Sequence, residues 1–428
     1  MKSSNPWWWI PTLYFAEGIP YFLVNNISVT MFNRMGVPNG EMALFTGLLY
    51  LPWTIKPLWS PFVDILRTRR WWIVAMQVLM AAAFVLLALT IPHPEAEMIS
   101  EGATPMSLFT LTLILFVITA FASATHDIAA DGFYMLALDK DKQSFFVGIR
   151  STFYRLSSVF GQGVLVMIAG LLEQRTGNIP AAWRTTIGLT ALIFAAVSIY
   201  HIFALPRPAE DINRSGSGAR EILTGFGRAF GTFFRKKEVW LAMAFMLLYR
   251  LPEAFLLKMV NPFLLDPLER GGLALQTSTV GLLYGTIGVI ALTVGGILGG
   301  IAASRWGLRK CLIPMALCLE LPCAVYIYMS MAGPGIVPIG ICAAIEQFGY
   351  GFGFTAYMLY MMYFSEGEFK TSHYAICTAF MALSMMIPGM FSVYIQEAMG
   401  YTGFFVFVMI CCVPAILVTL WVRKRLAK

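Results

Sequence analysis

The chain has 428 residues, of which 58% are hydrophobic and only 12% are charged, and its mean hydropathy is +0.71. This composition excludes a soluble globular protein, in which about a quarter of the residues are charged. The net charge of +7 does not indicate nucleic-acid binding. The basic residues lie in short loops beside apolar segments, where retention during membrane insertion and anionic lipid headgroups account for them.

Apolar segments of about 20 residues, the length that crosses a bilayer as a helix, recur along nearly the whole chain. We predict an all-α membrane protein with twelve transmembrane helices in two pseudo-symmetric six-helix bundles. The predicted spans are 7–33, 41–65, 71–92, 106–137, 145–171, 185–204, 238–263, 278–304, 311–331, 335–364, 372–396 and 401–422. The bundles cover residues 1–204 and 238–428. The polar stretch 205–237 is predicted to be a cytoplasmic linker, within which residues 220–234 have the pattern of a helix on the membrane surface.

Most of the 30 Lys and Arg residues lie on one side of this arrangement. Because positive loops stay in the cytoplasm, both termini are expected to be cytoplasmic, in a multi-pass protein of the bacterial inner membrane. No cleavable signal peptide is expected, since residues 1–6 are short and polar and three tryptophans (7–9) typical of an aromatic belt follow. The seven cysteines lack CxxC spacing and are interpreted as small buried residues.

The two halves of the chain contain matching motifs. The sequence Gly-Leu-Leu-Tyr occurs at 47–50, early in the second span, and again at 281–284, early in the eighth. A Leu-Tyr pair followed by a glutamate occurs at 13–17 in the first span and at 248–253 in the seventh. Two matches at nearly the same offset indicate an internal repeat of six spans.

Short basic turns follow the second and the eighth spans, at 61–70 and 299–310. They resemble the signature loop of the major facilitator superfamily, although the second copy has Ser304 where an acid is expected. An acid in this loop can pair with the basic cluster and latch one conformation of a gate. The gating candidates in these turns are Asp64, Arg69, Arg70, Arg305 and Arg309. The alternative is a solvated cluster that only sets the topology.

Glu17 lies in the first span and is followed by Gly18 and Pro20. Glycine loosens a helix and proline removes a backbone donor. A carboxylate beside a broken span is a common way for transporters to expose a proton site. Glu17 is therefore a proton-coupling candidate, and the alternative is an interfacial residue near the cytoplasmic end.

Asp127 and Asp131 lie four residues apart near the end of the fourth span and share one helix face. Arg150 and Arg155 open the fifth span at a similar depth, so we expect an aspartate–arginine pair between these spans. The functional interpretation is proton coupling through the aspartates and gating through the arginines, and the alternative is a structural bridge. The neighbouring His126 is as readily a packed residue as a proton carrier.

Three further ionisable residues lie within predicted spans. Lys56 lies between Pro52 and Pro57 in the second span, and Arg250 and Glu253 lie three residues apart in the seventh, where they can pair. Lys56 and Arg250 are also candidates for binding an anionic substrate, for which arginine offers a bidentate fork. Glu253 is a further proton-coupling candidate.

The tenth span carries polar and aromatic residues beside a run of glycines at 349–353 that lets helices approach closely. Glu346 is a proton-coupling candidate, and Gln347, Tyr350 and Tyr357 are candidates for a wall that binds sugar rings. The alternative is that they are helix-packing residues. In the ninth span, Glu320 between two leucines is as readily structural as functional.

Several segments resemble the peptide–acetyl-CoA transporter branch of the major facilitator superfamily, which includes AmpG-type muropeptide permeases. They are Trp53 to Pro61 with Asp64, Ala124 to Gly132, Glu346 with Gly351 to Ala356, Thr371 to Ala375, and Pro388 to Tyr401. The family usually has Gln where His126 stands. The resemblance implies a proton-coupled importer of amino-sugar or peptidoglycan fragments, although relatives of this branch also carry acyl-CoA or siderophores.

We therefore predict a monomeric secondary transporter that takes up a small solute with protons and switches by rocking of its two bundles around a central cavity. Its expected partners are the solute, protons and the lipid bilayer, without a cofactor, a metal or nucleic acid. A passive facilitator is an alternative. A membrane-embedded acyl-group enzyme using His126 and Asp127 is another, and the internal repeat and the lack of a nucleophile constellation argue against it.

Overall fold

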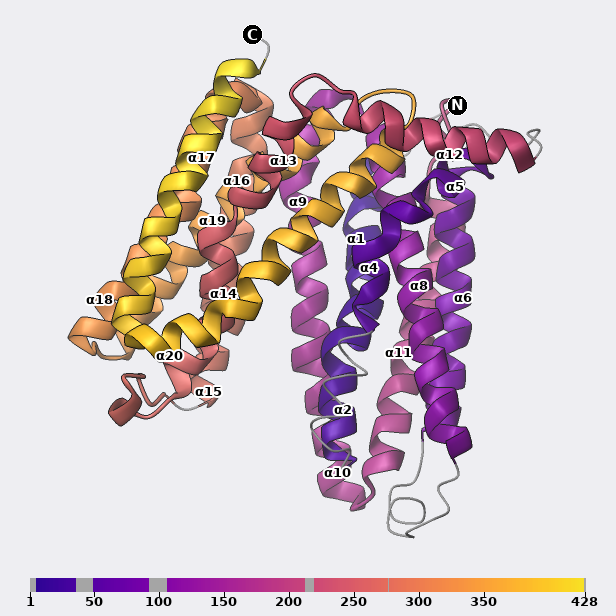
Figure 1. Ribbon diagram of the computed structural model, residues 1–428. Helices are drawn as coiled ribbons and strands as arrows, with labels where there is room; N and C mark the ends of the chain where they lie inside the picture. The colour runs from indigo at the N-terminus through magenta and orange to yellow at the C-terminus, as the bar shows by residue number, and fades with distance from the viewer. Residues whose placement is uncertain (1–4, 36–48, 92–105, 212–218, 276, 427–428) are drawn as a thin grey trace. The chain divides into compact units, whose positions relative to one another are not determined.

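A computed structural model describes residues 5–35, 49–91, 106–211, 219–275 and 277–426 (Figure 1). All regular structure in these ranges is helical. The chain divides into two compact units. One comprises Met1–Ala137 and Phe153–Gly225, and the other comprises Leu138–Thr152 and Phe226–Lys428.

The helices follow the order of the predicted spans. The first half contains η1 (Pro6–Trp8), α1 (Ile10–Phe22), η2 (Leu23–Ile27), α2 (Ser28–Arg34), α4 (Leu51–Ile55), η3 (Lys56–Leu58), α5 (Ser60–Ile65), α6 (Arg69–Thr90), α8 (Met106–Ala137), α9 (Lys140–Ser158), η4 (Val159–Leu165), α10 (Val166–Thr176) and α11 (Ile179–Ala204). The linker contains α12 (Ala219–Phe234). The second half contains α13 (Val239–Leu248), α14 (Leu251–Leu265), η5 (Leu268–Arg270), α15 (Thr277–Val280), η6 (Gly281–Gly288), α16 (Val289–Trp306), α17 (Leu308–Glu320), η7 (Leu321–Ala324), α18 (Val325–Ala332), α19 (Ile336–Phe364) and α20 (Lys370–Arg425).

Nine helices in the described ranges are long and apolar enough to cross a membrane. The longest, α20, contains two of the predicted spans and bends at Gly400, whose φ of 66° lies in the left-handed region that glycine adopts most easily (Figure 1). The interrupted helices of residues 6–34 and 51–65 correspond to the first two predicted spans. The predicted all-helical fold is therefore confirmed, and the described helices follow the order of the predicted spans. The start of the second span and the serine–glycine run of the linker lie outside the described residues.

The interruptions occur where the sequence weakens the helix. In the first span, Pro20 lies inside α1, and the π-helical turn η2 follows it. Proline cannot donate the hydrogen bond that continues the ladder, so the turn widens to satisfy the carbonyls it leaves. In the second span, Pro52 lies in α4, and Pro57 lies within the short 3₁₀ segment η3 that follows. Glu17 precedes the first of these irregular turns, and Lys56 begins the second.

Each unit has its own apolar core. In the first, α6 packs against α8 and α11, with Phe84 edge-on to Phe194. In the second, α14 packs against α20, where Phe263 contacts Phe405. Large apolar residues on the outward faces stay exposed, for example Leu192, and such continuous apolar exposure fits a helix that faces lipid.

The glycines of α19 let three helices of the second unit pack closely. A Cβ added at Gly351 would lie 2.2 Å from the Leu292 carbonyl oxygen of α16, and one at Gly349 would lie 2.0 Å from the Cys318 oxygen of α17. Backbone atoms cannot give way as a flexible side chain does. The predicted role of these glycines in helix packing is therefore confirmed.

Replacing Gly351 by valine should force α16 and α19 apart and lower the free energy of unfolding by about 1–3 kcal/mol. The melting temperature of the solubilised protein measures this loss. Gly170→Val is the matched control, because nothing lies within 4 Å of a Cβ at Gly170. An unchanged melting temperature for Gly351→Val would show that the two helices are not held at this distance.

Asp139 caps the N-terminus of α9, accepting a hydrogen bond of 2.8 Å from the backbone N–H of Lys142 and one of 2.7 Å from its ammonium group. These bonds lower the pKa of Asp139. A lowered carboxyl pKa adds stability above the ordinary aspartate value, about 3.9, and this stability is lost as the pH falls through the folded-state pKa.

We therefore expect Asp139→Ala to lower the free energy of unfolding by about 1 kcal/mol at neutral pH, and Asp139→Asn, which remains a good cap, to lower it less. The difference in melting temperature between wild type and Asp139→Ala should shrink as the pH is taken down to about 3. If wild type and Asp139→Ala differ in melting temperature by the same amount at neutral pH and at about pH 3, the Asp139 carboxylate is not the source of the stabilisation.

Candidate functional site

Three carboxylates lie together inside the first unit. Glu17 comes from α1, and Asp127 and Asp131 come from neighbouring turns of α8, so the predicted common face of the two aspartates is confirmed. One oxygen from each residue lies within 4.8 Å of the other two. Glu17 and Asp131 are only 5% and 4% exposed. Asp127 is half-buried. Three carboxylates this close repel one another strongly unless a cation or protons neutralise them.

Lys56 supplies positive charge to this cluster, in an ion pair between its ammonium group and Asp127. The side chain is 5% exposed and starts from η3, where the two prolines interrupt the second span. The charges of Asp131 and Glu17 also act on it. The expected pair was Asp127 or Asp131 with Arg150 or Arg155. The ion pair shown for Asp127 is with Lys56, and a pair between Asp131 and one of the arginines stays a prediction.

Tyr14 of α1 adds a hydrogen bond to the cluster, donating its hydroxyl to Asp131 Oδ1 at 3.3 Å. The three carboxylate oxygens also satisfy the spacing that a bound cation needs. The ammonium group of Lys56 already provides a countercharge there, so the residues fit an ion-pair network better than a metal centre. The chemistry available to this cluster is the gain and loss of protons, which changes how strongly Lys56 is held.

The two arginines of α9 are placed differently from each other. Arg150 is buried, and Arg155 is half-buried one turn and a residue later. Arg150 belongs to the second compact unit, and Arg155 belongs to the first. Their role as a gate remains a prediction.

The turn after α5 contains the acid–base pair that the sequence predicted. Asp64 is buried and accepts a hydrogen bond of 2.5 Å from Arg69 Nη2. Asp211, from the linker, accepts hydrogen bonds of 2.7 and 3.1 Å from the backbone N–H groups of Arg69 and Arg70 at the start of α6. Arg70 in turn donates to the carbonyls of Ile202 and Leu205 at the end of α11.

The sequence analysis missed Asp211, although an acid after two prolines in a basic linker was a usable signal. It fixes the N-terminus of α6, where a negative charge is favourable. In the second copy of this turn, Arg305 is exposed and Arg309 is half-buried at the junction of α16 and α17. Neither makes an ion pair with a described residue, in keeping with Ser304 standing where the acid would be.

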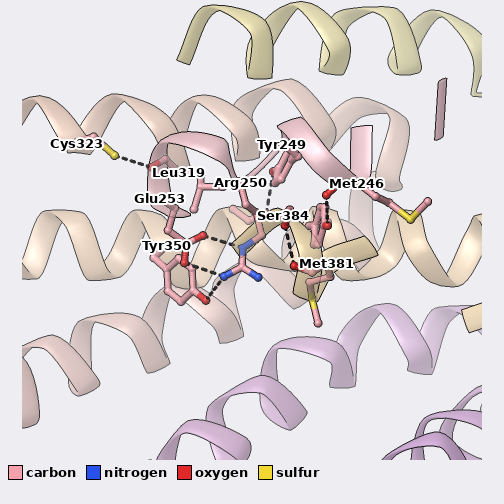
Figure 2. Close-up of polar contacts among 11 residues, drawn as sticks. Met246, Tyr249, Arg250, Glu253, Leu319, Cys323, Tyr350, Met381 and Ser384 are labelled. Atoms are coloured by element: carbon pink, nitrogen blue, oxygen red, sulfur yellow. Dashed lines mark hydrogen bonds and ion pairs between the residues drawn. The ribbon is translucent and has the colours of Figure 1, made fainter. Parts of the chain in front are cut away.

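Arg250 forms the polar centre of the second unit. It lies at the break between α13 and α14 and is 6% exposed. Its Nε and Nη2 atoms donate to the two carboxylate oxygens of Glu253, both at 2.8 Å, and Nη2 also donates to the Tyr350 hydroxyl at 3.0 Å (Figure 2). The predicted Arg250–Glu253 pair is confirmed, and its fork geometry is the one that arginine uses for carboxylates and phosphates in general.

Aromatic rings of α19 surround the guanidinium group of Arg250. Its central carbon lies 4.8 Å from the ring centre of Phe354, 5.7 Å from that of Tyr350 and 5.9 Å from that of Tyr357. Tyr357 is fully buried and donates its hydroxyl to the carbonyl of Met246. The tyrosines expected to line a wall for sugar rings thus both contact Arg250, which they hold through cation–π attraction.

The remaining two candidates on α19 contact each other. Gln347 Nε2 donates to Glu346 Oε2 at 2.8 Å. Glu346 is buried, whereas Gln347 is half-buried. They lie about one turn before Tyr350, so the four candidates of this span occupy the same helix.

The internal repeat seen in the sequence has a structural counterpart. Tyr14 in the first span of one half donates to Asp131 in the fourth span, and Tyr249 in the first span of the other half donates to the Gly353 carbonyl in its fourth span, at 2.9 Å. Each half therefore uses a tyrosine to tie its first helix to its fourth. The acid that follows each tyrosine, Glu17 or Glu253, lies in that half's buried charge cluster.

A buried chain of hydrogen bonds lies beside the carboxylates of the first unit. Gln77 lies 3.0 Å from His126 Nε2 and 2.9 Å from His201 Nδ1, and His201 Nε2 lies 3.0 Å from the Thr12 hydroxyl. Neither Gln77 nor His201 was identified from the sequence. Gln77 binds Nε2 of His126, so this histidine is part of the buried hydrogen-bonded chain.

Comparison with known proteins identifies the family. A family model described as Major Facilitator Superfamily matches residues 12–372. The putative transporter AmpG 4 of Rickettsia felis is 25% identical over 426 residues, covering 96% of this chain and 94% of the relative. The anhydromuropeptide permease of Escherichia coli K12 is 24% identical over 421 residues, covering 97% of this chain and 79% of the permease.

Solved structures agree with the family match. The E. coli fucose:proton symporter FucP superposes with a TM-score of 0.70 at 14% identity over 98% of both chains. The proton:xylose symporter XylE superposes with a TM-score of 0.68 at 12% identity, over 97% of this chain and 94% of that one. These proteins are transporters, not enzymes. With the family match across most of its length, the chain belongs to the Major Facilitator Superfamily and is a multi-pass membrane transporter.

Proposed function

We propose that this transporter couples the uptake of a small anionic solute to the entry of protons, in the bacterial inner membrane with both termini in the cytoplasm. The solute we propose is an amino-sugar or muropeptide-type fragment of the cell wall. The relatives of this chain include an anhydromuropeptide permease, and the solved structures it superposes on include two proton symporters.

The observation that carries the proton coupling is the buried cluster of Glu17, Asp127 and Asp131 around Lys56. Three carboxylates whose oxygens lie within 4.8 Å of one another repel each other, so the cluster favours the uptake of protons. A proton on Asp127 breaks its ion pair with Lys56 and lowers the free energy needed to change conformation. Coupling follows because the protonated and deprotonated clusters favour different conformations of the transporter.

Arg250 supports the anionic part of the proposal. Its guanidinium group is held by aromatic rings and paired with Glu253, so a solute carboxylate or phosphate can replace Glu253 with the same two hydrogen bonds. An exchange of one carboxylate for another keeps the buried arginine neutralised throughout. The tyrosines beside it offer flat apolar faces next to hydroxyl groups.

Purified protein in proteoliposomes tests the proposal. Vesicles given an inward proton gradient should accumulate labelled anhydromuropeptide above the external concentration, and an uncoupler should abolish the accumulation. If the internal concentration of the solute rises only to the external concentration, and the uncoupler does not change it, the protein is a passive facilitator. A parallel thermal-shift screen with acyl-CoA and iron–siderophore complexes tests the other anionic solutes, since a bound ligand raises the melting temperature.

A further inference from the structure

Glu320 is a buried acid that none of the interactions above involves. It is the last residue of α17, followed by the 3₁₀ segment η7 with Pro322. Its relative exposure is only 1%. The helix is therefore broken directly beside a carboxyl group, as it is near Glu17 in the first unit.

Neither side-chain oxygen of Glu320 accepts a hydrogen bond from a nitrogen or oxygen atom of a described residue, and its polar neighbour is the thiol of Cys412. Its immediate surroundings are otherwise sulfur and apolar groups. Cys412 Sγ lies 3.7 Å from the backbone oxygen of Glu320, and Cys323 and Cys411 lie nearby. A bare carboxylate in such a place carries a large desolvation penalty, whereas the neutral acid does not.

Charged groups of the Arg250 site act on Glu320. They are Glu253 and Arg250 at the start of α14, and Glu320 acts in turn on Tyr249 beside them. From α20 the facing groups are the two cysteines. The glycines of α19 that pack against α17, Gly349 and Gly353, bring no charge.

We infer that Glu320 is a second proton-binding residue, in the second unit, which loads and releases a proton in step with the anion site at Arg250. This inference rests on the proposed proton coupling. In the conformation described here Glu320 holds its proton. When the break at η7 becomes accessible to water, the O–H bond breaks, the proton passes to water and the electron pair stays on the carboxylate.

Arg250 links the release of the proton from Glu320 to the binding of the solute. The ion pair of Arg250 with Glu253 acts electrostatically on Glu320. Binding an anionic solute at Arg250 changes that local balance of charge. If Glu320 had only a structural role, its charge state would not respond to the solute. A glutamine of the same shape would then replace it without loss of transport.

Glu320→Gln tests the inference in proteoliposomes, with Glu269→Gln as the matched control at an exposed position. Labelled anhydromuropeptide is followed in two assays, accumulation driven by a proton gradient and exchange between equal concentrations without a gradient. We expect Glu320→Gln to lose the driven accumulation and keep the exchange, and Glu269→Gln to keep both. Driven accumulation at the wild-type level in Glu320→Gln would overturn the inference. Failure of the wild type itself would instead reject the proposed coupling.

Infrared spectroscopy of the protein in lipid nanodiscs tests the protonation without any solute. A protonated carboxylic acid has a carbonyl stretch separate from the bands of carboxylates and amides. The wild-type spectrum minus that of Glu320→Gln should contain one such band. Glu320→Asp keeps a carboxylic acid and should shift the band, so it serves if the glutamine variant does not fold. A difference spectrum without a protonated-acid band would reject the assignment.

Discussion

Asp127→Asn is expected to abolish proton-driven uptake while the protein still inserts and folds. The amide cannot take up or release a proton, and it leaves the ammonium group of Lys56 without its direct partner. Breaking a buried ion pair from one side costs about 3–5 kcal/mol, which corresponds to at least a hundredfold on a rate (about 1.4 kcal/mol per tenfold). Initial uptake rates in proteoliposomes, at matched protein content, measure the loss.

A double variant separates the charge of the pair from its proton chemistry. Lys56→Gln together with Asp127→Asn removes both charges, so the melting temperature should recover toward that of the wild type while uptake stays absent. Asp139→Asn is the matched control, since it makes the same chemical change at an exposed helix cap. Wild-type uptake by Asp127→Asn would show that the Lys56–Asp127 pair is only scaffolding.

Arg250→Lys is expected to weaken the binding of the anionic solute by about tenfold to a hundredfold. Lysine keeps the charge but loses the fork that now bonds both oxygens of Glu253, and it stacks less well within the rings of α19. A charge-assisted hydrogen bond contributes about 1.5–3 kcal/mol, which sets this range. Isothermal titration of the purified protein with anhydromuropeptide measures the dissociation constant.

Glu253→Gln provides the opposite test at the same site. Removing the carboxylate leaves Arg250 without the charge that competes with the solute, so solute binding should become tighter while proton-driven accumulation falls. This split between binding and accumulation is specific to a competing counter-ion. If both variants bind the solute as the wild type does, Arg250 is not the anion site.

The fold was predictable because the signals it needs are local. Hydropathy over a window of about 20 residues depends only on neighbouring residues, and the predicted spans agree with the helices to within a few residues. The division of α20 was found from the sequence near Gly400. The repeated Tyr–Glu motif correctly indicated two related halves, because each tyrosine contacts the fourth helix of its own half.

Partners across helices were predicted less well. The Arg250–Glu253 pair was found because its residues are three apart on one helix, and Asp64–Arg69 because both lie in one turn. The ion pair of Asp127 with Lys56, which comes from an earlier span, was not predicted. Asp211 was missed because it reaches the helix N-terminus from more than a hundred residues away.

The sequence by itself determined that the protein lies in a membrane, the order of its apolar helices, and which charged residues lie within them. These follow from the free energy of transferring each segment into lipid, a sum over neighbouring residues. Only the tertiary structure decided which charges neutralise one another. It placed Lys56 among three carboxylates, enclosed Arg250 in aromatic rings and left the Glu320 side chain without a nitrogen or oxygen hydrogen-bond partner among the described residues. Such pairings depend on the rotation and depth of each helix against its neighbours, which packing fixes and composition does not.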